Sequence, residues 1–179
     1  MIRYEGFSDA EETRVRTVVQ RIPQLPPDDV VISVANLSLE LGMTELESSY
    51  YRVRLAPVIF ALPDGCAEFI IAHELGHVAH DHGRKIIAAW RALDPAGPHL
   101  AHLPDSSVWM LMHLVPKHPD METIRMWFEL VADRQVEQWF PEYAVAFRCA
   151  YPNDERFTPE WRAATEQAFE AVPWPQQEE

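Results

Sequence analysis

The sequence predicts an α+β fold in which a small mixed sheet of about three strands packs on a central helix and is followed by a mainly helical carboxy-terminal part. Two observations lead to this prediction. Runs rich in β-branched and aromatic residues lie within 30–35 and 50–62, and most of the long helical patterns come after residue 65. With 179 residues and 47% apolar content, the chain can bury one substantial core, so we expect residues 1–179 to form a single domain.

The amino-terminal part carries the first helix and the strands. Ser8 and Glu11 have the spacing of a capping box, and apolar residues follow at helical intervals until Pro23, which predicts an amphipathic helix between these points. The short runs VVISVA, YYRVRL and PVIFAL are β-branched or aromatic and are predicted to be strands.

Helices dominate the rest of the sequence. From Cys66 to His80 the chain lacks proline and is rich in alanine, isoleucine and leucine, which favours a helix. Asp120 is a candidate cap for the long helical run METIRMWFELVADRQVEQWF, and Thr158 precedes a proline in the order typical of a helix start. The less regular segment 84–120 is interpreted as an insertion or a lid.

Composition argues against several classes of function. The formal net charge is −13 and the 15 basic residues form no cluster, whereas binding to nucleic acid needs clustered lysine and arginine. No run of about eighteen apolar residues occurs, and the amino terminus turns acidic before an apolar signal segment could begin. Cys66 and Cys149 lack C-x-x-C spacing and are expected to be reduced, packed thiols. The sequence therefore predicts a cytoplasmic protein without a membrane span.

The segment IIAHELGHVAHDHG, residues 70–83, places titratable side chains in an apolar helix, where burying them costs free energy unless something pairs with them. His73 and His77 would project about 40° apart on a helix, so their ring nitrogens can converge on one ion. Glu74 would lie beside the ion and take a proton from a zinc-bound water. The pattern H-E-x-x-H thus predicts a catalytic zinc site. The alternative is two solvent-facing or internally hydrogen-bonded histidines on an ordinary helix.

A catalytic zinc ion needs a third protein ligand and keeps a fourth position open. A histidine at position 83 would complete one such pattern, but this residue is Gly83. The other solution is a carboxylate from a separate helix, and the run WFELVADRQ supplies Glu129, with Asp133 one turn later. Glu129 would complete a His-His-Glu set, and Asp133 would accept the spare N–H of a ligand histidine. The small Ala132 would let the two helices approach. The alternative is an acidic pair on an exposed helix face.

The two motifs AHELGHVAHDHG and FELVADR resemble those of the gluzincin metallopeptidases, in particular the HtpX and CAAX-prenyl-protease-like group. The first motif is also similar to that of the small ImmA/IrrE-like metallopeptidases, which cut repressor proteins. The likeness in the order of elements extends over most of 28–140. The resemblance implies a zincin-like fold and a soluble zinc-dependent metallopeptidase that acts on a peptide or protein substrate.

By the same resemblance, His73, His77 and Glu129 would bind zinc, Glu74 would be the general base and Asp133 would support a ligand histidine. The substrate would lie extended along an edge strand, which PVIFAL or YYRVRL would provide. Membrane-embedded members of the first group carry spanning helices that this sequence lacks, which argues against a lipidated or membrane substrate.

Two other functions share these motifs. The first is a zincin-fold regulatory or binding protein whose metal site is not proteolytic, and the second is metal-dependent hydrolysis of a non-peptide amide. His80 and His82 follow the motif and are more typical of structural residues. An oxyanion donor would come from the remaining histidines and tyrosines, with His113 and Tyr143 as the candidates.

Overall fold

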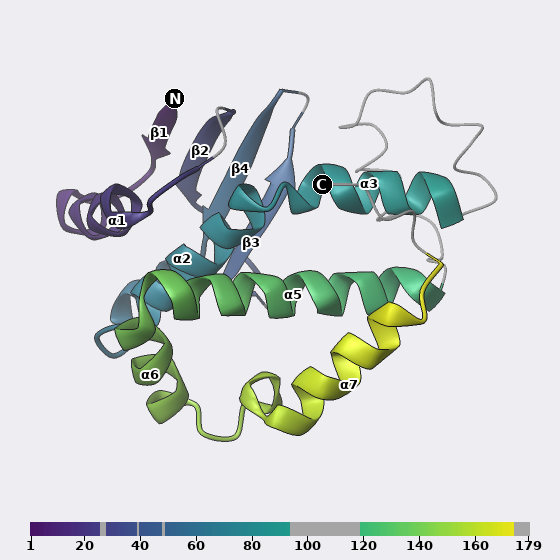
Figure 1. The fold of residues 1–179 in the computed structure, drawn as a ribbon. Coiled ribbons are helices and arrows are strands. Elements are labelled where there is room, and N and C mark those ends of the chain that lie inside the picture. Colours follow the sequence, from purple (N-terminus) through teal and green to yellow (C-terminus); the bar gives the residue numbers. More distant parts are fainter. Residues whose placement is uncertain (26–27, 39, 48, 94–118, 174–179) are drawn as a thin grey trace.

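A four-stranded mixed sheet and six α-helices make up the described part of this computed structural model, residues 1–25, 28–38, 40–47, 49–93 and 119–173 (Figure 1). The predicted α+β class is therefore confirmed. The strands are β1 (Ile2–Glu5), β2 (Asp29–Val34), β3 (Gly42–Leu46) and β4 (Tyr50–Leu55). The α-helices are α1 (Asp9–Arg21), α2 (Cys66–Ala79), α3 (His82–Leu93), α5 (Pro119–Trp139), α6 (Pro141–Ala150) and α7 (Pro159–Glu170). Two short 3-10 helices are η1 (Pro57–Ala61) and η3 (Glu155–Phe157).

The strands lie in the order β1-β2-β4-β3, with β1, β2 and β4 parallel and β3 antiparallel to β4. The register pairs Ile2 with Val30, and it pairs Val53 with both Ile32 and Thr44. Val30, Ile32 and Val53 are buried in the main core, so this face of the sheet packs on the helices. Because paired residues point to the same face, Thr44 of the edge strand β3 also points toward the helical layer.

The strand predictions for VVISVA and YYRVRL are confirmed as β2 and β4, whereas the prediction for PVIFAL is wrong. These last residues form η1, because Pro57 has no N–H for a strand ladder and its fixed φ suits the first turn of a helix. The expected substrate edge is also wrong, since β4 lies inside the sheet and PVIFAL is not a strand. The edge nearest α2 is β3, and neither β1 nor β3 was predicted.

The predicted helix starts are mostly confirmed. Ser8 caps α1 in a complete capping box, with its N–H donating to the Glu11 carboxylate at 2.8 Å. Thr158 caps α7 and accepts the Trp161 N–H at 3.2 Å. Asp120 is not a cap, because α5 already begins one residue earlier and places this carboxylate in its first turn.

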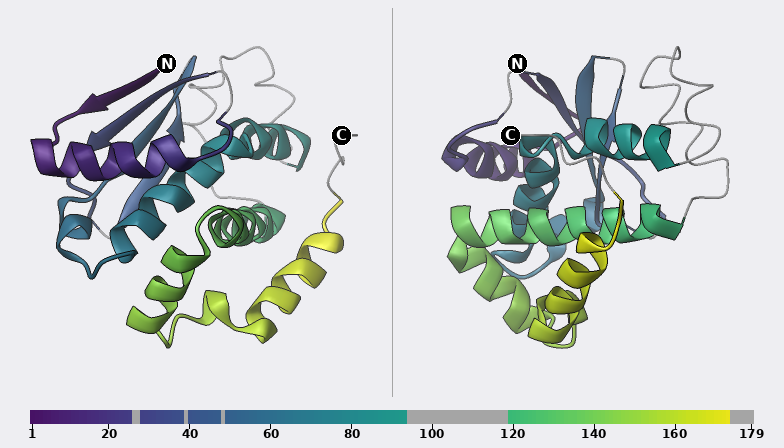
Figure 2. Two further views of the ribbon diagram at one scale, coloured as in Figure 1. Left: turned by 60° about the vertical axis from the view of Figure 1, so that its left-hand side comes forward. Right: turned by 45° about the vertical axis from the view of Figure 1, so that its right-hand side comes forward.

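Helix α2 is buried on almost its whole circumference, between the sheet, α1, α5 and α6. In both views of Figure 2, α5 runs below the sheet, and α6 and α7 lie on the side of α5 that faces away from the sheet. A Cβ added to Gly76 of α2 would lie 3.3 Å from the Ala132 Cα of α5, so a larger side chain would push the two helices apart. The close approach of two helices that the small Ala132 predicts is confirmed, with Gly76 of α2 opposite it.

We expect Gly76→Val to lower the free energy of unfolding by about 1–3 kcal/mol, because the added methyl groups overpack the contact with Ala132. Valine has a higher helix propensity than glycine, so a lower free energy of unfolding cannot come from a weaker helix. Urea denaturation measures the change. The control is Ala163→Val on the exposed face of α7, which should cost less than 1 kcal/mol as an order of magnitude. Equal stability of Gly76→Val and the wild type would contradict the close contact.

The segment 84–120, interpreted as an insertion or a lid, falls into two parts. Residues 84–93 continue α3, whose Ile87 and Trp90 are buried, and residues 94–118 lie outside the described residues. The expectation of packed thiols is confirmed for the buried Cys66 and wrong for Cys149, which is exposed; both are free.

Candidate metal centre

Helix α2 places His73, Glu74 and His77 at the centre of the molecule. His73 and Glu74 are each only 6% exposed. His73 and His77 lie one turn apart on the same side of the helix, with ring centroids 4.8 Å apart and their Nε2 atoms at 3.1 Å. Burial first of all, and then the nearby charge of His73, lower the pKa of His77 to about 4, so its ring is neutral near pH 7. A neutral imidazole is the form that binds a metal.

Helix α5 brings the two predicted carboxylates to these rings. The Glu129 Oε2 atom lies 3.1 Å from the His73 Nε2, and its Oε1 atom lies 3.7 Å from the His77 Nε2. Burial would raise the pKa of Glu129, but the hydrogen bond to His73 and the electrostatic interaction with the two histidines lower it far below its usual range. Glu129 is therefore ionised and turned toward both rings.

Asp133 lies directly behind His73. Its Oδ1 atom is 2.8 Å from the His73 Nδ1, and the side chain is completely buried. Burial would lower the pKa of His73, but the hydrogen bonds with Asp133 and Glu129 raise it well above its usual value. The two carboxylates thus favour positive charge at this point. If a metal ion takes the place of the Nε2 proton, the ring keeps its Nδ1–H on Asp133 and offers its Nε2 lone pair on the side of Glu129 and His77.

The three potential ligand atoms from His73, His77 and Glu129 all lie within 4.8 Å of one another. The His73 Nε2 lies 3.1 Å from both the His77 Nε2 and the Glu129 Oε2, close to the spacing of about 3.3 Å between ligands that stand 2.0–2.1 Å from a tetrahedral ion. The distance of 3.7 Å from the His77 Nε2 is to the other carboxylate oxygen of Glu129, Oε1. Three donor atoms this close together can surround one cation, which would take the place of the proton between His73 and Glu129. The cluster can therefore hold a metal ion.

Glu74 lies beside these three residues, but its carboxylate is hydrogen-bonded to a different partner. Its Oε2 atom lies 2.7 Å from the Thr44 hydroxyl of β3, and a Cβ on Gly42 would lie 2.6 Å from its Oε1 atom. Only glycine therefore fits at position 42 without displacing the carboxylate. Burial is the main reason why the pKa of Glu74 rises to about 7, a value suited to a group that both accepts and donates a proton near neutral pH.

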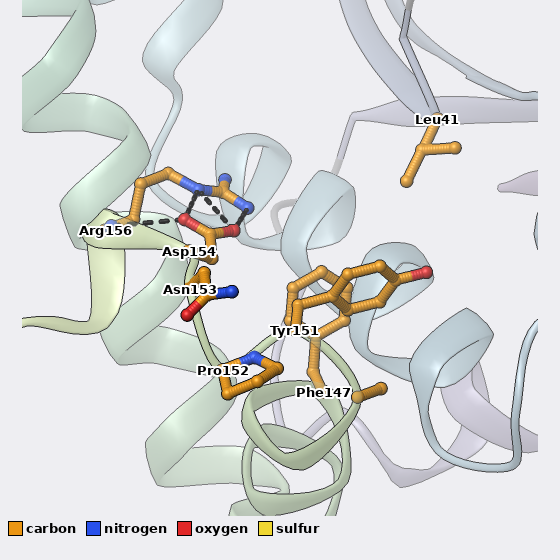
Figure 3. Close-up of a pocket in the computed structure, with 8 residues that line it drawn as sticks. Leu41, Phe147, Tyr151, Pro152, Asn153, Asp154 and Arg156 are labelled. Atoms are coloured by element: carbon orange, nitrogen blue, oxygen red, sulfur yellow. Dashed lines mark hydrogen bonds and ion pairs between the residues drawn. The ribbon is translucent and has the colours of Figure 1, made fainter.

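The cleft around these groups has a volume of about 730 Å³. Its walls come from β3, α2, α3 and α5, together with Phe147, Arg156 and Trp161 from the carboxy-terminal part. It adjoins a smaller cavity of about 450 Å³, which shares Leu41, Phe147 and Arg156 with it. Figure 3 shows Arg156 paired with Asp154 in this smaller cavity, at 2.9 Å between Nη2 and Oδ2.

All five predicted site residues, His73, Glu74, His77, Glu129 and Asp133, thus come together in one place. Sequence reasoning missed Gly42, Thr44 and Arg156, which are far from both motifs in the chain. No local signal could have found them, because strand pairing and the packing of α6 and α7 bring them to the cleft.

The remaining candidates have other surroundings. The His80 Nε2 lies 2.8 Å from the Gln135 Oε1, and the His82 Nδ1 lies 2.8 Å from the His77 Nδ1. The Tyr143 hydroxyl accepts a hydrogen bond from Arg21, and Tyr143 does not line the cleft, which argues against a role as oxyanion donor. His113 lies outside the described residues.

No protein-family model matches this chain, and a search of curated proteins gives no match. Among the residues that the structure describes, no helix is both long enough and apolar enough to cross a membrane.

Proposed function

We propose that this protein is a zinc metallopeptidase of the gluzincin type, with a zincin-like fold, that hydrolyses peptide bonds. One observation carries the proposal. The His73, His77 and Glu129 ligand atoms converge in a cleft that also holds the Glu74 carboxylate, which is not one of the three. A metal site with a purely structural role has no need of a further buried carboxylate beside it.

Zinc is the metal that best fits this set of donors. Two imidazole nitrogens and one carboxylate oxygen are a typical set of protein ligands for catalytic zinc, which leaves a fourth position open. When bound, zinc polarises the scissile carbonyl and makes a water molecule more acidic. Asp133 keeps the His73 ring in the orientation and tautomer that direct its Nε2 to the ion.

Glu74 would move the proton during hydrolysis. Its carboxylate accepts a proton from the attacking water as the new C–O bond forms, and passes that proton to the leaving amine as the C–N bond breaks. In the metal-free protein, burial raises the pKa of Glu74 to about 7. The Thr44 hydroxyl, 2.7 Å away, holds the carboxylate at the side of the cleft where β3 passes.

The position of β3 favours an extended peptide over a small amide as substrate. In the described part of the sheet, β3 pairs on one side only, with β4, and its residues Gly42, Met43 and Thr44 line the cleft. An extended chain could add to this free edge through backbone hydrogen bonds, which would place a peptide group across the metal centre. The edge strand, the buried motif helix and the glutamate helix together support a zincin-like fold.

The proposal is tested with the purified protein. We expect near-stoichiometric zinc by elemental analysis and cleavage of a degenerate library of internally quenched peptides. Dialysis against 1,10-phenanthroline should remove the zinc and abolish peptide cleavage, and added zinc should restore the cleavage. The reason is that the cleft residues need the ion to orient substrate and water. Zinc-loaded protein that cleaves no peptide in the library, or cleavage that survives complete removal of zinc, would contradict the proposal.

A further inference from the structure

We infer that His82 is a positioning residue of the metal centre, which accepts a hydrogen bond from His77 and so fixes the tautomer in which His77 can bind a metal. The inference rests on the metal site of the proposed function. It adds a second residue that orients a ligand histidine: Asp133 orients His73, and His82 orients His77. It stands on the 2.8 Å distance between the Nδ1 atoms of His77 and His82.

The protonation of these two rings follows from simple counting. A neutral imidazole carries one N–H and one lone pair, so one of two facing Nδ1 atoms must donate and the other must accept. His77 can offer its Nε2 lone pair to a metal only if its own proton is on Nδ1. In the metal-binding state, the His77 Nδ1–H therefore donates to the His82 Nδ1. Each ligand imidazole then has its own acceptor, Asp133 for His73 and His82 for His77.

Three observations indicate that the His82 ring is held in place. The side chain is buried, at 5% exposure. The ring lies flat on Phe128, with centroids 4.3 Å apart and planes at 9°, and Phe128 immediately precedes the ligand Glu129 on α5. A Cβ on the next residue, Gly83, would lie 2.8 Å from the Tyr51 ring, so the backbone at this point is tightly packed. The same helix that supplies the third ligand thus also orients His82.

The turn between α2 and α3 brings His82 back to His77. Asp81, between α2 and α3, adopts a left-handed backbone conformation with φ of 54°, and the chain changes direction there. Its carboxylate is held by the Tyr51 hydroxyl and by Arg84, whose Nη1 lies 2.9 Å away. Because of this turn, His82 contacts His77, five positions earlier in the chain. In a continuous helix, residues five apart point to different sides and would not meet.

The test is the zinc dissociation constant, measured by competition with a chelator of known affinity. His82→Phe keeps a flat ring for Phe128 but has no acceptor, and we expect about 10- to 100-fold weaker zinc binding, as when other groups that orient a ligand are removed. His82→Asn places its Oδ1 near the position of the Nδ1 and should bind zinc within about threefold of wild type. The control His80→Phe keeps a ring to stack on His82, with centroids 5.4 Å apart, and removes only the hydrogen bond to Gln135, so it should leave the constant unchanged.

A second readout does not depend on activity. In the zinc-loaded wild type and in His82→Asn, proton NMR should show a downfield, slowly exchanging His77 Nδ1–H, which should be absent in His82→Phe. Melting of the metal-free variants by circular dichroism shows whether they fold. If His82→Phe does not fold, His82→Gln takes its place, because glutamine carries its acceptor one bond further out and should bind zinc more weakly than His82→Asn.

Two results would overturn the inference. One is zinc binding by His82→Phe as tight as in the wild type, and the other is binding by His82→Asn as weak as by His82→Phe, which would assign the effect to packing. Zinc binding without peptide cleavage would overturn the proposed function alone. A wild-type protein that binds no zinc would overturn both.

Discussion

Glu74→Gln is expected to abolish peptide hydrolysis while leaving zinc bound. Glutamine has nearly the same shape as glutamate, and its amide oxygen can still accept the hydrogen bond from the Thr44 hydroxyl. It cannot accept a proton from water. Loss of a general base lowers the rate by a factor on the order of 10² to 10⁴, with the largest part in kcat because the proton moves only in the transition state.

The measurement is the steady-state rate on the best wild-type peptide, together with zinc content by elemental analysis. Glu170→Gln, an exposed glutamate in the last turn of α7, is the matched control and should retain full activity. Unchanged hydrolysis by Glu74→Gln would end the proposed role of this residue. The variant also separates an enzyme from a regulatory protein, because only an enzyme loses a catalysed reaction while zinc stays bound.

His77→Ala and Glu129→Ala are each expected to lose nearly all zinc and, with it, all hydrolysis. Each substitution would leave only two of the three proposed protein ligands, whose potential ligand atoms lie within 4.8 Å of one another. Removing Glu129 also leaves the two imidazole rings without the negative charge that offsets the ion.

Elemental analysis after dialysis against a weak chelator measures the loss. The matched controls stand on the same two helices: His80→Ala lies one turn beyond His77, and Glu137→Ala lies two turns beyond Glu129, where its carboxylate pairs with Arg148 and Arg162. Both controls should keep near-stoichiometric zinc. Near-stoichiometric zinc in either His77→Ala or Glu129→Ala would refute the assignment of that ligand.

The features that sequence reasoning found are those with a short-range signal. The predicted helix from Cys66 to His80 agrees with α2 to within one residue, because composition and a proline-free run decide it locally. Residues four apart on a helix meet whatever surrounds them, so His73 with His77, and Glu129 with Asp133, could be paired from spacing alone.

The features that it missed depend on partners far away in the chain. The strand GMTEL contains a glycine and two polar residues, and only its pairing with β4 makes it an edge strand. The sequence predicts a structural role for His82, and only the turn at Asp81 shows that this ring faces His77. The prediction of a strand for PVIFAL is wrong because the periodicity of a short apolar run does not distinguish a strand from a helical turn.

The sequence by itself determined α1, α2, α5 and α7, the caps of α1 and α7, and the two groups of potential ligands. Hydrogen bonds and side-chain neighbours within a helix are set by residues three or four positions apart. Only the tertiary structure decided which strand borders the cleft, that Thr44 and Gly42 enclose Glu74, and that His77 faces His82. Those contacts join residues that are neighbours through strand order, a left-handed turn and the close crossing of α2 and α5, and none of these is encoded at a fixed spacing along the chain.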